Sequence, residues 1–240
     1  AARQLALSIV VRRPLDPNAN QILGLVALEQ GDFAAAKRHL EQANQAAPGQ
    51  APILNALGVA VRRGGDLGRA RALFTQAGQL GLIDGWRNLG NLESHERYGE
   101  AALAAYERAL KLSPNDSLTH AGLAQIYEGR HDLARAKLHA AAALRGDAAN
   151  ETARLTLTQV LLREKDFAGA EAAALPVTRK AGAAAANLAL AWGVIGEARD
   201  RLDDTRGAFA AFTSANTILR EQNVALLNAT HLLFHPEGVA

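Results

Sequence analysis

Apolar and polar residues alternate along this chain with the spacing of amphipathic helices. Apolar positions recur three and four residues apart in blocks, and each block is long enough for a helix of about three to four turns. Short breaks such as Gly31-Asp32 and Gly65-Asp66 divide the blocks into pairs, and Pro-Gly or Asn-Asp steps close most pairs. Because proline cannot continue a helix, the pattern predicts pairs of helices joined by tight turns.

The helix pairs repeat with a nearly constant period. An apolar residue followed by a small one occurs in each first block, at positions 23, 57, 89, 123, 157 and 195, in steps of 34, 32, 34, 34 and 38. A period near 34 residues is typical of solenoids, in which each repeat buries a face against its neighbours. The short step falls near Gly78–Gly85. The long one falls around Lys180–Asn187, where we expect the Ala183–Ala186 run to lengthen the next helix.

The small residues predict close helix packing. Gly90 should face Ala102 where the two helices of one repeat meet, while large residues such as Trp86 and Tyr106 fill the space toward the next repeat. The expected division of the chain is a partial repeat, six full repeats, and a C-terminal capping helix with its tail. Their ranges are 1–17, about 17–50, 51–82, 83–116, 117–150, 151–184, 189–222, and 223–240.

The spacing within one repeat resembles the tetratricopeptide repeat family. Residues 83–116 contain the pattern W-x2-L-G, then A-x3-Y-x2-A and a closing proline, at Trp86, Leu89, Gly90, Ala102, Tyr106, Ala109 and Pro114. Arg97 stands where the family usually has glycine, and Lys165 and Ala148 likewise depart from the glycine and proline positions. The resemblance covers residues 2–222. It implies an all-α fold, a right-handed α-solenoid of antiparallel helix pairs, and a protein-protein interaction scaffold.

Composition supports this fold class and narrows the partners. Hydrophobic residues make up 49% of the 240 and aromatic residues only 5%, so alanine supplies much of the apolar content and favours closely packed helices. With 26 basic and 24 acidic residues, the net charge of +2 gives no case for nucleic acid. No apolar run is long enough to span a membrane and no leader opens the chain, so a cytoplasmic location is expected. The oligomeric state stays open.

No catalytic or metal-binding constellation emerges from the residues. The chain lacks cysteine, a phosphate-binding loop and a context for a nucleophilic serine, so we expect no enzyme activity and no cofactor. His231 and His235 lie four apart, but Pro236 ends that helix and no third ligand accompanies them, so no metal is predicted. Asp200, Asp203 and Asp204 resemble an acidic cluster but are interpreted as turn and capping residues between two helices.

The resemblance places binding on the concave face, which the first helix of each pair lines. It implies groove positions at Asn55, Arg62, Arg63, Arg87, Asn88, Asn91, His95, Gln125, Gln159 and Arg163, with Glu197 and Arg201 in the last repeat. Arg62, Arg63 and Arg87 come from neighbouring first helices. Together with the asparagines they predict a groove for an extended, anionic peptide or protein segment.

An alternative function follows from the last repeat. Residues from Gly196 to Gln222 resemble the final repeat before the catalytic domain of bacterial tetratricopeptide sulfotransferases. On this interpretation the chain would present a substrate or partner to a catalytic domain beyond Ala240.

Overall fold

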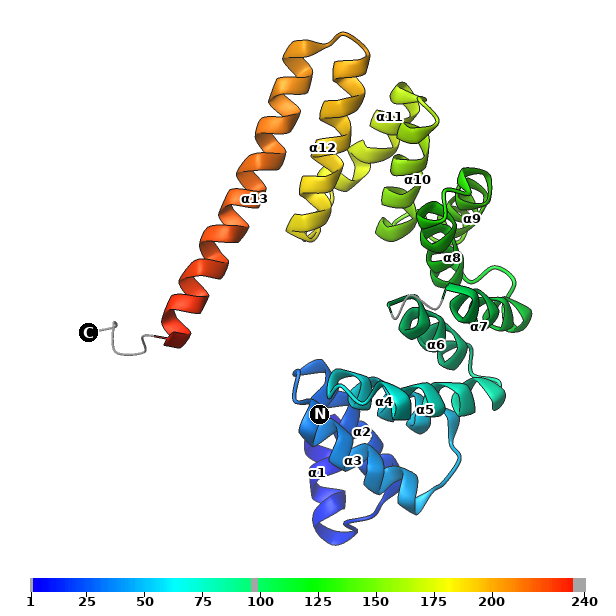
Figure 1. Ribbon diagram of the computed structural model, residues 1–240. Coiled ribbons are helices and arrows are strands. Elements are labelled where there is room, and N and C mark those ends of the chain that lie inside the picture. The colour runs from blue at the N-terminus through cyan, green and yellow to red at the C-terminus, as the bar shows by residue number, and fades with distance from the viewer. Residues whose placement is uncertain (1, 96–98, 235–240) are drawn as a thin grey trace. The chain divides into compact units, whose positions relative to one another are not determined.

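The computed structural model describes residues 2–95 and 99–234, and the side chains of residues 2–94 and 99–223. These residues form thirteen helices and no strand, in two compact units, residues 1–119 (unit 1) and 120–240 (unit 2) (Figure 1). Unit 1 contains α1 (Ala2–Arg12), α2 (Pro17–Glu29), α3 (Phe33–Ala46), α4 (Ala51–Arg63), α5 (Leu67–Gln79), α6 (Ile83–His95) and α7 (Gly99–Leu112). Helix α8 (Ser117–Gly129) starts at the end of unit 1. Unit 2 continues with α9 (Leu133–Gly146), α10 (Glu151–Arg163), α11 (Phe167–Thr178), α12 (Ala185–Arg201) and α13 (Thr205–Phe234).

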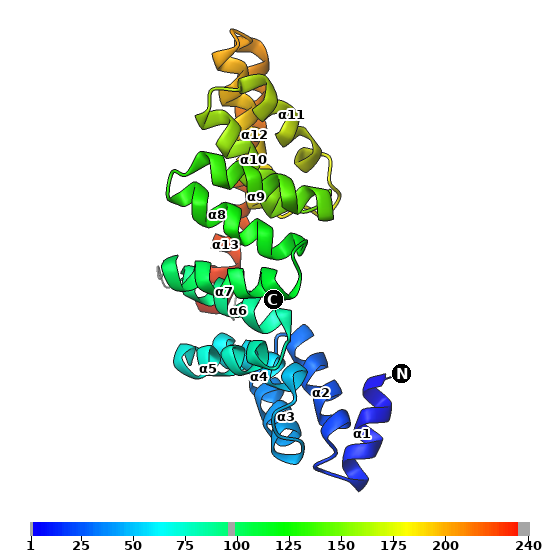
Figure 2. The ribbon, with the colours of Figure 1, turned by 90° about the vertical axis from the view of Figure 1, so that its right-hand side faces the viewer.

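Within each unit the helices pack in chain order as antiparallel pairs (Figures 1 and 2). We call the even-numbered helices from α2 to α12 the first helices and the odd-numbered helices from α3 to α13 the second helices. Successive first helices also contact each other directly, α2 with α4, α4 with α6, and α10 with α12. The predicted fold class, an all-α solenoid of helix pairs, is confirmed.

Aspartates define where the second helices begin. The carboxylates of Asp32, Asp66, Asp132 and Asp166 each accept a hydrogen bond of 2.9–3.0 Å from the backbone N–H three residues later. Asp204 caps α13 in the same way, at 2.9 Å from the N–H of Gly207, which agrees with its interpretation as a capping residue. Asp200, expected in the same turn, lies instead in the last turn of α12. Each cap satisfies a backbone donor that the first turn leaves unpaired.

The turn before each cap keeps a left-handed backbone even without glycine. Gly31 and Gly65 have φ of 75° and 88°, and the corresponding His131, Lys165 and Asp203 have φ of 61°, 65° and 64°. Left-handed backbone is unfavourable for residues with a Cβ, so the hydrogen bonds that close the turn must hold these three residues there.

In α2, α4, α6 and α12, a glycine packs against a large side chain of the second helix of the same pair. A Cβ added at Gly90 would lie 2.5 Å from the ring of Tyr106, so Gly90 faces Tyr106, and its expected contact with Ala102 stays a prediction. Gly58 with Phe74 and Gly196 with Phe212 repeat this contact. Because glycine has no side chain, the aromatic ring lies directly against the backbone of the first helix, and the two helices can approach closely.

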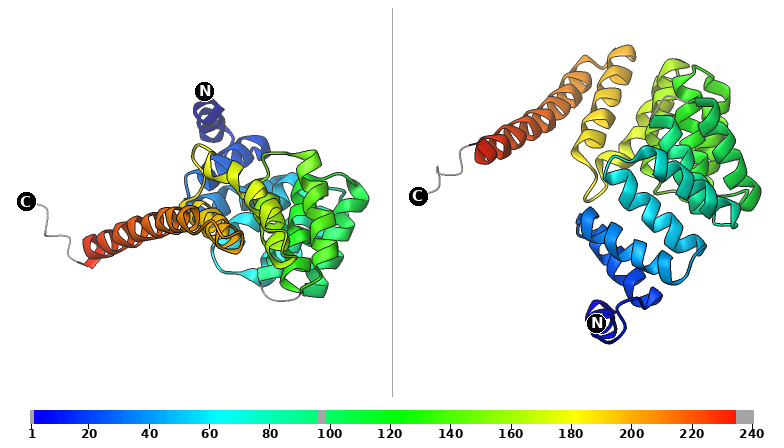
Figure 3. Two further views of the ribbon diagram at one scale, coloured as in Figure 1. Left: turned by 90° about the horizontal axis from the view of Figure 1, so that it is seen from above. Right: turned by 60° about the horizontal axis from the view of Figure 1, so that its bottom comes forward.

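The last helix pair differs from the others in length. Helix α12 has 17 residues where most first helices have 13, which agrees with the lengthening expected from the Ala183–Ala186 run. Helix α13 has 30 residues and runs without a break through residue 223, where the sequence predicts a separate capping helix (Figure 3). No glycine or proline lies between Gly207 and Pro236, so nothing in the sequence interrupts this helix. The capping role of residues 223–240 stays a prediction.

Candidate functional site

The first helices of unit 1 bring several predicted groove residues together. The side-chain amide of Asn88 on α6 donates a 2.9 Å hydrogen bond to the side-chain oxygen of Asn55 on α4. Both residues are half-buried. The bond joins neighbouring first helices and occupies one donor and one acceptor that the sequence assigned to a ligand.

A second predicted groove residue positions a buried tyrosine. The hydroxyl of Tyr106 donates a 2.6 Å hydrogen bond to the side-chain oxygen of Asn91. Burial raises the pKa of Tyr106 to about 12, against a smaller opposing effect of Arg87. Tyr106 therefore stays neutral, and Asn91 satisfies its hydroxyl inside the repeat.

Arg87 belongs to an internal ion-pair network. Its guanidinium contacts the carboxylate of Asp84 and lies 3.3 Å from both carboxylate oxygens of Asp116. Asp116 also accepts hydrogen bonds from the backbone N–H and the hydroxyl of Thr119, at 2.8 and 2.6 Å. Burial alone would raise the pKa of Asp116, but the Thr119 hydrogen bonds and the charge of Arg87 together hold it below its ordinary value. Two carboxylates thus surround Arg87, and its charge is already compensated within the protein.

Arg62 and Arg63 end helix α4 in a different environment. Arg62 is half-buried and has no ion-pair partner within the described ranges 2–94 and 99–223. Burial, and to a lesser extent the charge of Arg63, lowers its pKa. Arg63 is exposed and lies over the ring of Phe33, 5.7 Å from the centroid. The side chain of His95, another predicted groove residue, lies outside the described part of the chain.

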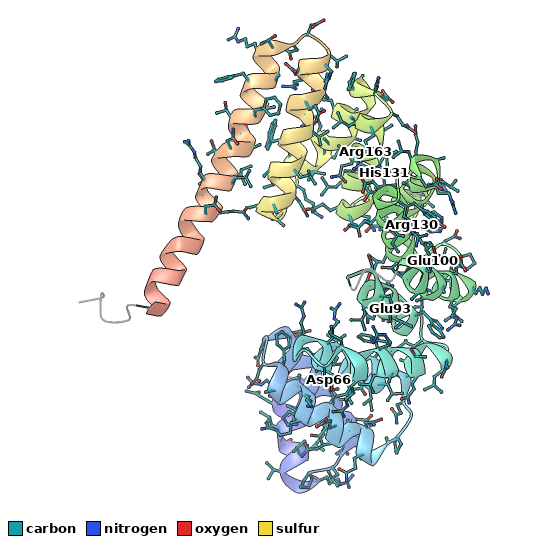
Figure 4. The ribbon with its side chains drawn as sticks, in the orientation of Figure 1. Asp66, Glu93, Glu100, Arg130, His131 and Arg163 are labelled. Carbon is teal, nitrogen blue, oxygen red and sulfur yellow. The ribbon has the colours of Figure 1, made fainter. Side chains whose placement is uncertain are left out.

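The predicted groove residues of unit 2 lie in different environments. Gln125 on α8 is exposed. Arg163 on α10 forms a 2.9 Å ion pair with Glu128, and one of its nitrogens lies 3.2 Å from Nδ1 of His131; Figure 4 shows Arg163 beside His131. Gln159 and Arg163 also line a mainly apolar cavity of about 690 Å³ between α10, α12 and α13, together with Glu197. We call this cavity the α12–α13 groove.

Two histidines form a polar contact that the sequence did not reveal. Nδ1 of His120 and Nδ1 of His139 lie 2.9 Å apart, and the ring of His139 stacks on Tyr127. The corresponding positions of the second full repeat hold the apolar pair Leu54 and Leu73. Burial lowers the pKa of His139, and the charges of His120 and Arg135 add to this effect. The contact between α8 and α9 therefore favours a neutral His139.

We expect the stability of unit 2 to depend on pH through this histidine pair. The folded protein holds His139 below the ordinary pKa of 6.5, so the unfolded chain binds its proton more readily. The contribution is fully present above about pH 6.5 and is lost as the pH falls toward the lower folded value. The variant His120→Leu/His139→Leu should show a smaller loss of unfolding free energy between about pH 7 and 5 in urea titrations. Parallel pH profiles of parent and variant would contradict this assignment.

A buried carboxylate, Glu93, forms an ion pair that was not predicted from the sequence. Glu93 on α6 is only 5% exposed, and both of its oxygens accept hydrogen bonds from Arg71 on α5, at 2.5 and 3.3 Å. Nothing in the sequence signalled this pair, because the two residues lie 22 positions apart in different repeats. This pair links α5, a second helix, to α6, the next first helix.

Neither a membrane helix nor a metal-binding group is present in the part of the chain that the structure describes. None of the described helices combines the length and the apolar character that a membrane span requires. The described side chains form no cluster of three or more metal-ligating residues. His235, one of the two histidines weighed as metal ligands, lies outside the described residues.

These features define a class of protein, the helical-repeat proteins, whose binding surfaces are built from stacked helix pairs. The comparisons then give the family. The tetratricopeptide repeat family model matches residues 27–80. Residues 27–80 therefore match tetratricopeptide repeats, as the sequence predicted, and the likeness of solved structures extends the fold over most of the chain.

Three solved structures illustrate that likeness. PilF of Pseudomonas aeruginosa has a TM-score of 0.71 at 21% identity, with 88% of this chain and 90% of that one covered. The Cut9–Hcn1 hetero-tetramer of the APC/C has a TM-score of 0.70 at 16% identity, with 89% and 45% covered, so this chain spans less than half of that one. A human IFIT1 dimer with PPP-AAAA has a TM-score of 0.70 at 14% identity, with 98% and 60% covered. No curated protein matches the chain.

Proposed function

We propose that the protein is a scaffold for protein–protein interaction, and that its first helices in unit 1 bind an extended, acidic segment of a partner at Arg62 and Arg63. The tetratricopeptide repeat fold supports the general function. The acidic preference rests mainly on one observation, the half-buried Arg62 without a carboxylate partner within the described ranges.

The contrast with other arginines gives this observation its weight. Arg71, Arg87, Arg163 and Arg199 all have carboxylate partners inside the protein. A guanidinium that is partly removed from water without such a partner loses hydration that nothing replaces. The backbone carbonyls at the end of α4 make the charge tolerable, and an acidic ligand would compensate it fully.

The position of Arg62 suits an extended ligand. Arg62 follows Asn55 by seven residues, which is two turns along the same face of α4. Asn55 faces α6 through its bond to Asn88, so a segment running along this face would pass both amides before it reaches the arginines. The proposed site therefore keeps Asn55, Arg62, Arg63 and Asn88 from the sequence prediction and omits Arg87.

Selection from a library of random 12-residue peptides displayed on phage tests this proposal. We expect the enriched peptides to be rich in Asp and Glu, and their binding to weaken as salt rises. Arg62→Ala/Arg63→Ala should reduce affinity at least about tenfold, equivalent to about 1.4 kcal/mol. The matched control is Arg12→Ala/Arg13→Ala, which removes two adjacent exposed arginines at the end of α1, outside the first helices, and should bind as the parent does.

Two results would overturn the proposal. Enrichment of basic or purely apolar peptides, or equal binding by the two double variants, would remove Arg62 and Arg63 from the site. Binding of single-stranded RNA that depends on these arginines, without any peptide enrichment, would assign the same face to nucleic acid instead.

A further inference from the structure

The last repeat leaves open a face that every earlier full repeat covers. Phe212 is 41% exposed, whereas the residues at its repeat position, Leu40, Phe74, Tyr106, Ala140 and Ala174, are at most 2% exposed. In the second full repeat the next first helix provides the cover, because Phe74 belongs to one apolar cluster with Trp86 and Leu89 of α6. Within the described residues, no helix covers this face of the last repeat.

The α12–α13 groove marks where that helix would lie. Leu190 and Val194 of α12 line one side, and Phe212 and Leu219 of α13 line the other. Leu190 and Leu219 are 37% and 45% exposed. Phe212 occupies the repeat position at which Phe74 meets α6, so this mainly apolar surface lies where a following first helix would pack.

The same chain carries an apolar helical segment beyond its last helix pair. Helix α13 runs antiparallel to α12 after a short turn (Figures 1 and 3). Since α12 has 17 residues, α13 lies alongside it only up to about residue 221 and then extends past its end. Residues 224–234, VALLNATHLLF, continue the helix, and eight of these eleven residues are apolar while none is Asp, Glu, Lys or Arg. Such a composition is typical of a helix that is covered on more than one side.

We propose that two copies of the chain exchange these segments, so that residues 224–234 of each copy occupy the α12–α13 groove of the other. Within one copy the segment cannot turn back onto its own groove, because α13 is continuous and contains no glycine or proline after Gly207. An eleven-residue helix has three turns, close to the length of the 13-residue first helices that fill the equivalent position elsewhere. The exchange is isologous and closes as a dimer.

This proposal is independent of the proposed function, since the acidic-segment site lies in unit 1 and the groove in unit 2. A dimer without peptide binding, or peptide binding by a monomer, would therefore separate the two.

The molar mass in solution tests the exchange. Sedimentation equilibrium of the full chain at micromolar concentration should give about twice 25.3 kDa. Two groove variants, Phe212→Glu and Leu219→Glu, and the segment variant Leu226→Glu/Leu227→Glu should each give monomers. Because Phe212 also packs on Gly196, the variant that should keep the helical circular dichroism of the parent is Leu219→Glu, at a 45% exposed leucine. Leu138→Glu, at a 62% exposed leucine of α9 outside the groove, is the matched control and should remain a dimer.

Mixing the variants distinguishes exchange from other modes of association. A tagged Phe212→Glu chain has an intact segment, and a Leu226→Glu/Leu227→Glu chain has an intact groove. The mixture should therefore contain heterodimers, whereas each variant by itself stays monomeric. A monomeric parent, or a dimer that both groove variants leave intact, would overturn the proposal.

Discussion

Gly85→Ala is expected to destabilise unit 1 by about 3 kcal/mol or more. A Cβ at this position would lie 2.4 Å from the backbone nitrogen of Gly78, 2.8 Å from the carbonyl oxygen of Phe74 and 2.9 Å from the carbonyl carbon of Ala77. All three atoms belong to the backbone of α5, so no side-chain rotation can relieve the overlap. Urea unfolding followed by circular dichroism measures the loss.

Gly68→Ala in α5 is the control for this change. The nearest atom to its added Cβ is a carboxylate oxygen of Asp66 at 3.9 Å, an ordinary contact. This variant should match the parent or gain a few tenths of a kcal/mol, because alanine favours the helix. Equal unfolding midpoints for the two variants would mean that α5 and α6 can separate at little cost.

Arg71→Ala should cost about 3 kcal/mol, the second large effect. Removing the guanidinium leaves the Glu93 carboxylate, 5% exposed, without the donors that hold both of its oxygens. A buried charge that loses its partner is far more destabilising than the net contribution of the intact pair. Adding Glu93→Gln to Arg71→Ala should recover part of the loss, since the remaining group is then neutral.

An exposed ion pair between α5 and α3 serves as the comparison for the buried pair of Arg71 and Glu93. Arg69 and Glu41 lie 2.8 Å apart with side chains 42% and 39% exposed, so Arg69→Ala should cost no more than about 1 kcal/mol. In thermal and urea unfolding, Arg71→Ala should therefore lose clearly more free energy of unfolding than Arg69→Ala. Losses of equal size would show that water reaches Glu93 and that the pair is an ordinary surface contact.

The period of the sequence was enough to predict the fold. Small and large apolar residues return every 34 or so positions because each helix pair meets the next through the same contacts, so one register fixes the helices along the chain. The short step near Gly78–Gly85 was also visible, but only as a change in loop length. The structure shows that Gly85 lies in α6, where a side chain would overlap the backbone of α5.

The candidate site was predictable only in part. Helical spacing assigns residues such as Asn55, Arg62 and Arg87 to the first helices, but it does not tell which of their polar groups are already used. The partner of Arg87, Asp116, lies 29 residues away in a turn before α8, and that distance in sequence hides the pair. The histidine contact between His120 and His139 was hidden for the same reason.

Nuclear magnetic resonance can locate the proposed binding face of unit 1 residue by residue. Titrating the isotope-labelled chain with a selected acidic 12-residue peptide reports which backbone amides change their environment. We expect changes concentrated on α2, α4 and α6 and strongest around Arg62 and Arg63. Changes concentrated on the second helices α3, α5 and α7, or in the α12–α13 groove, would contradict this expectation.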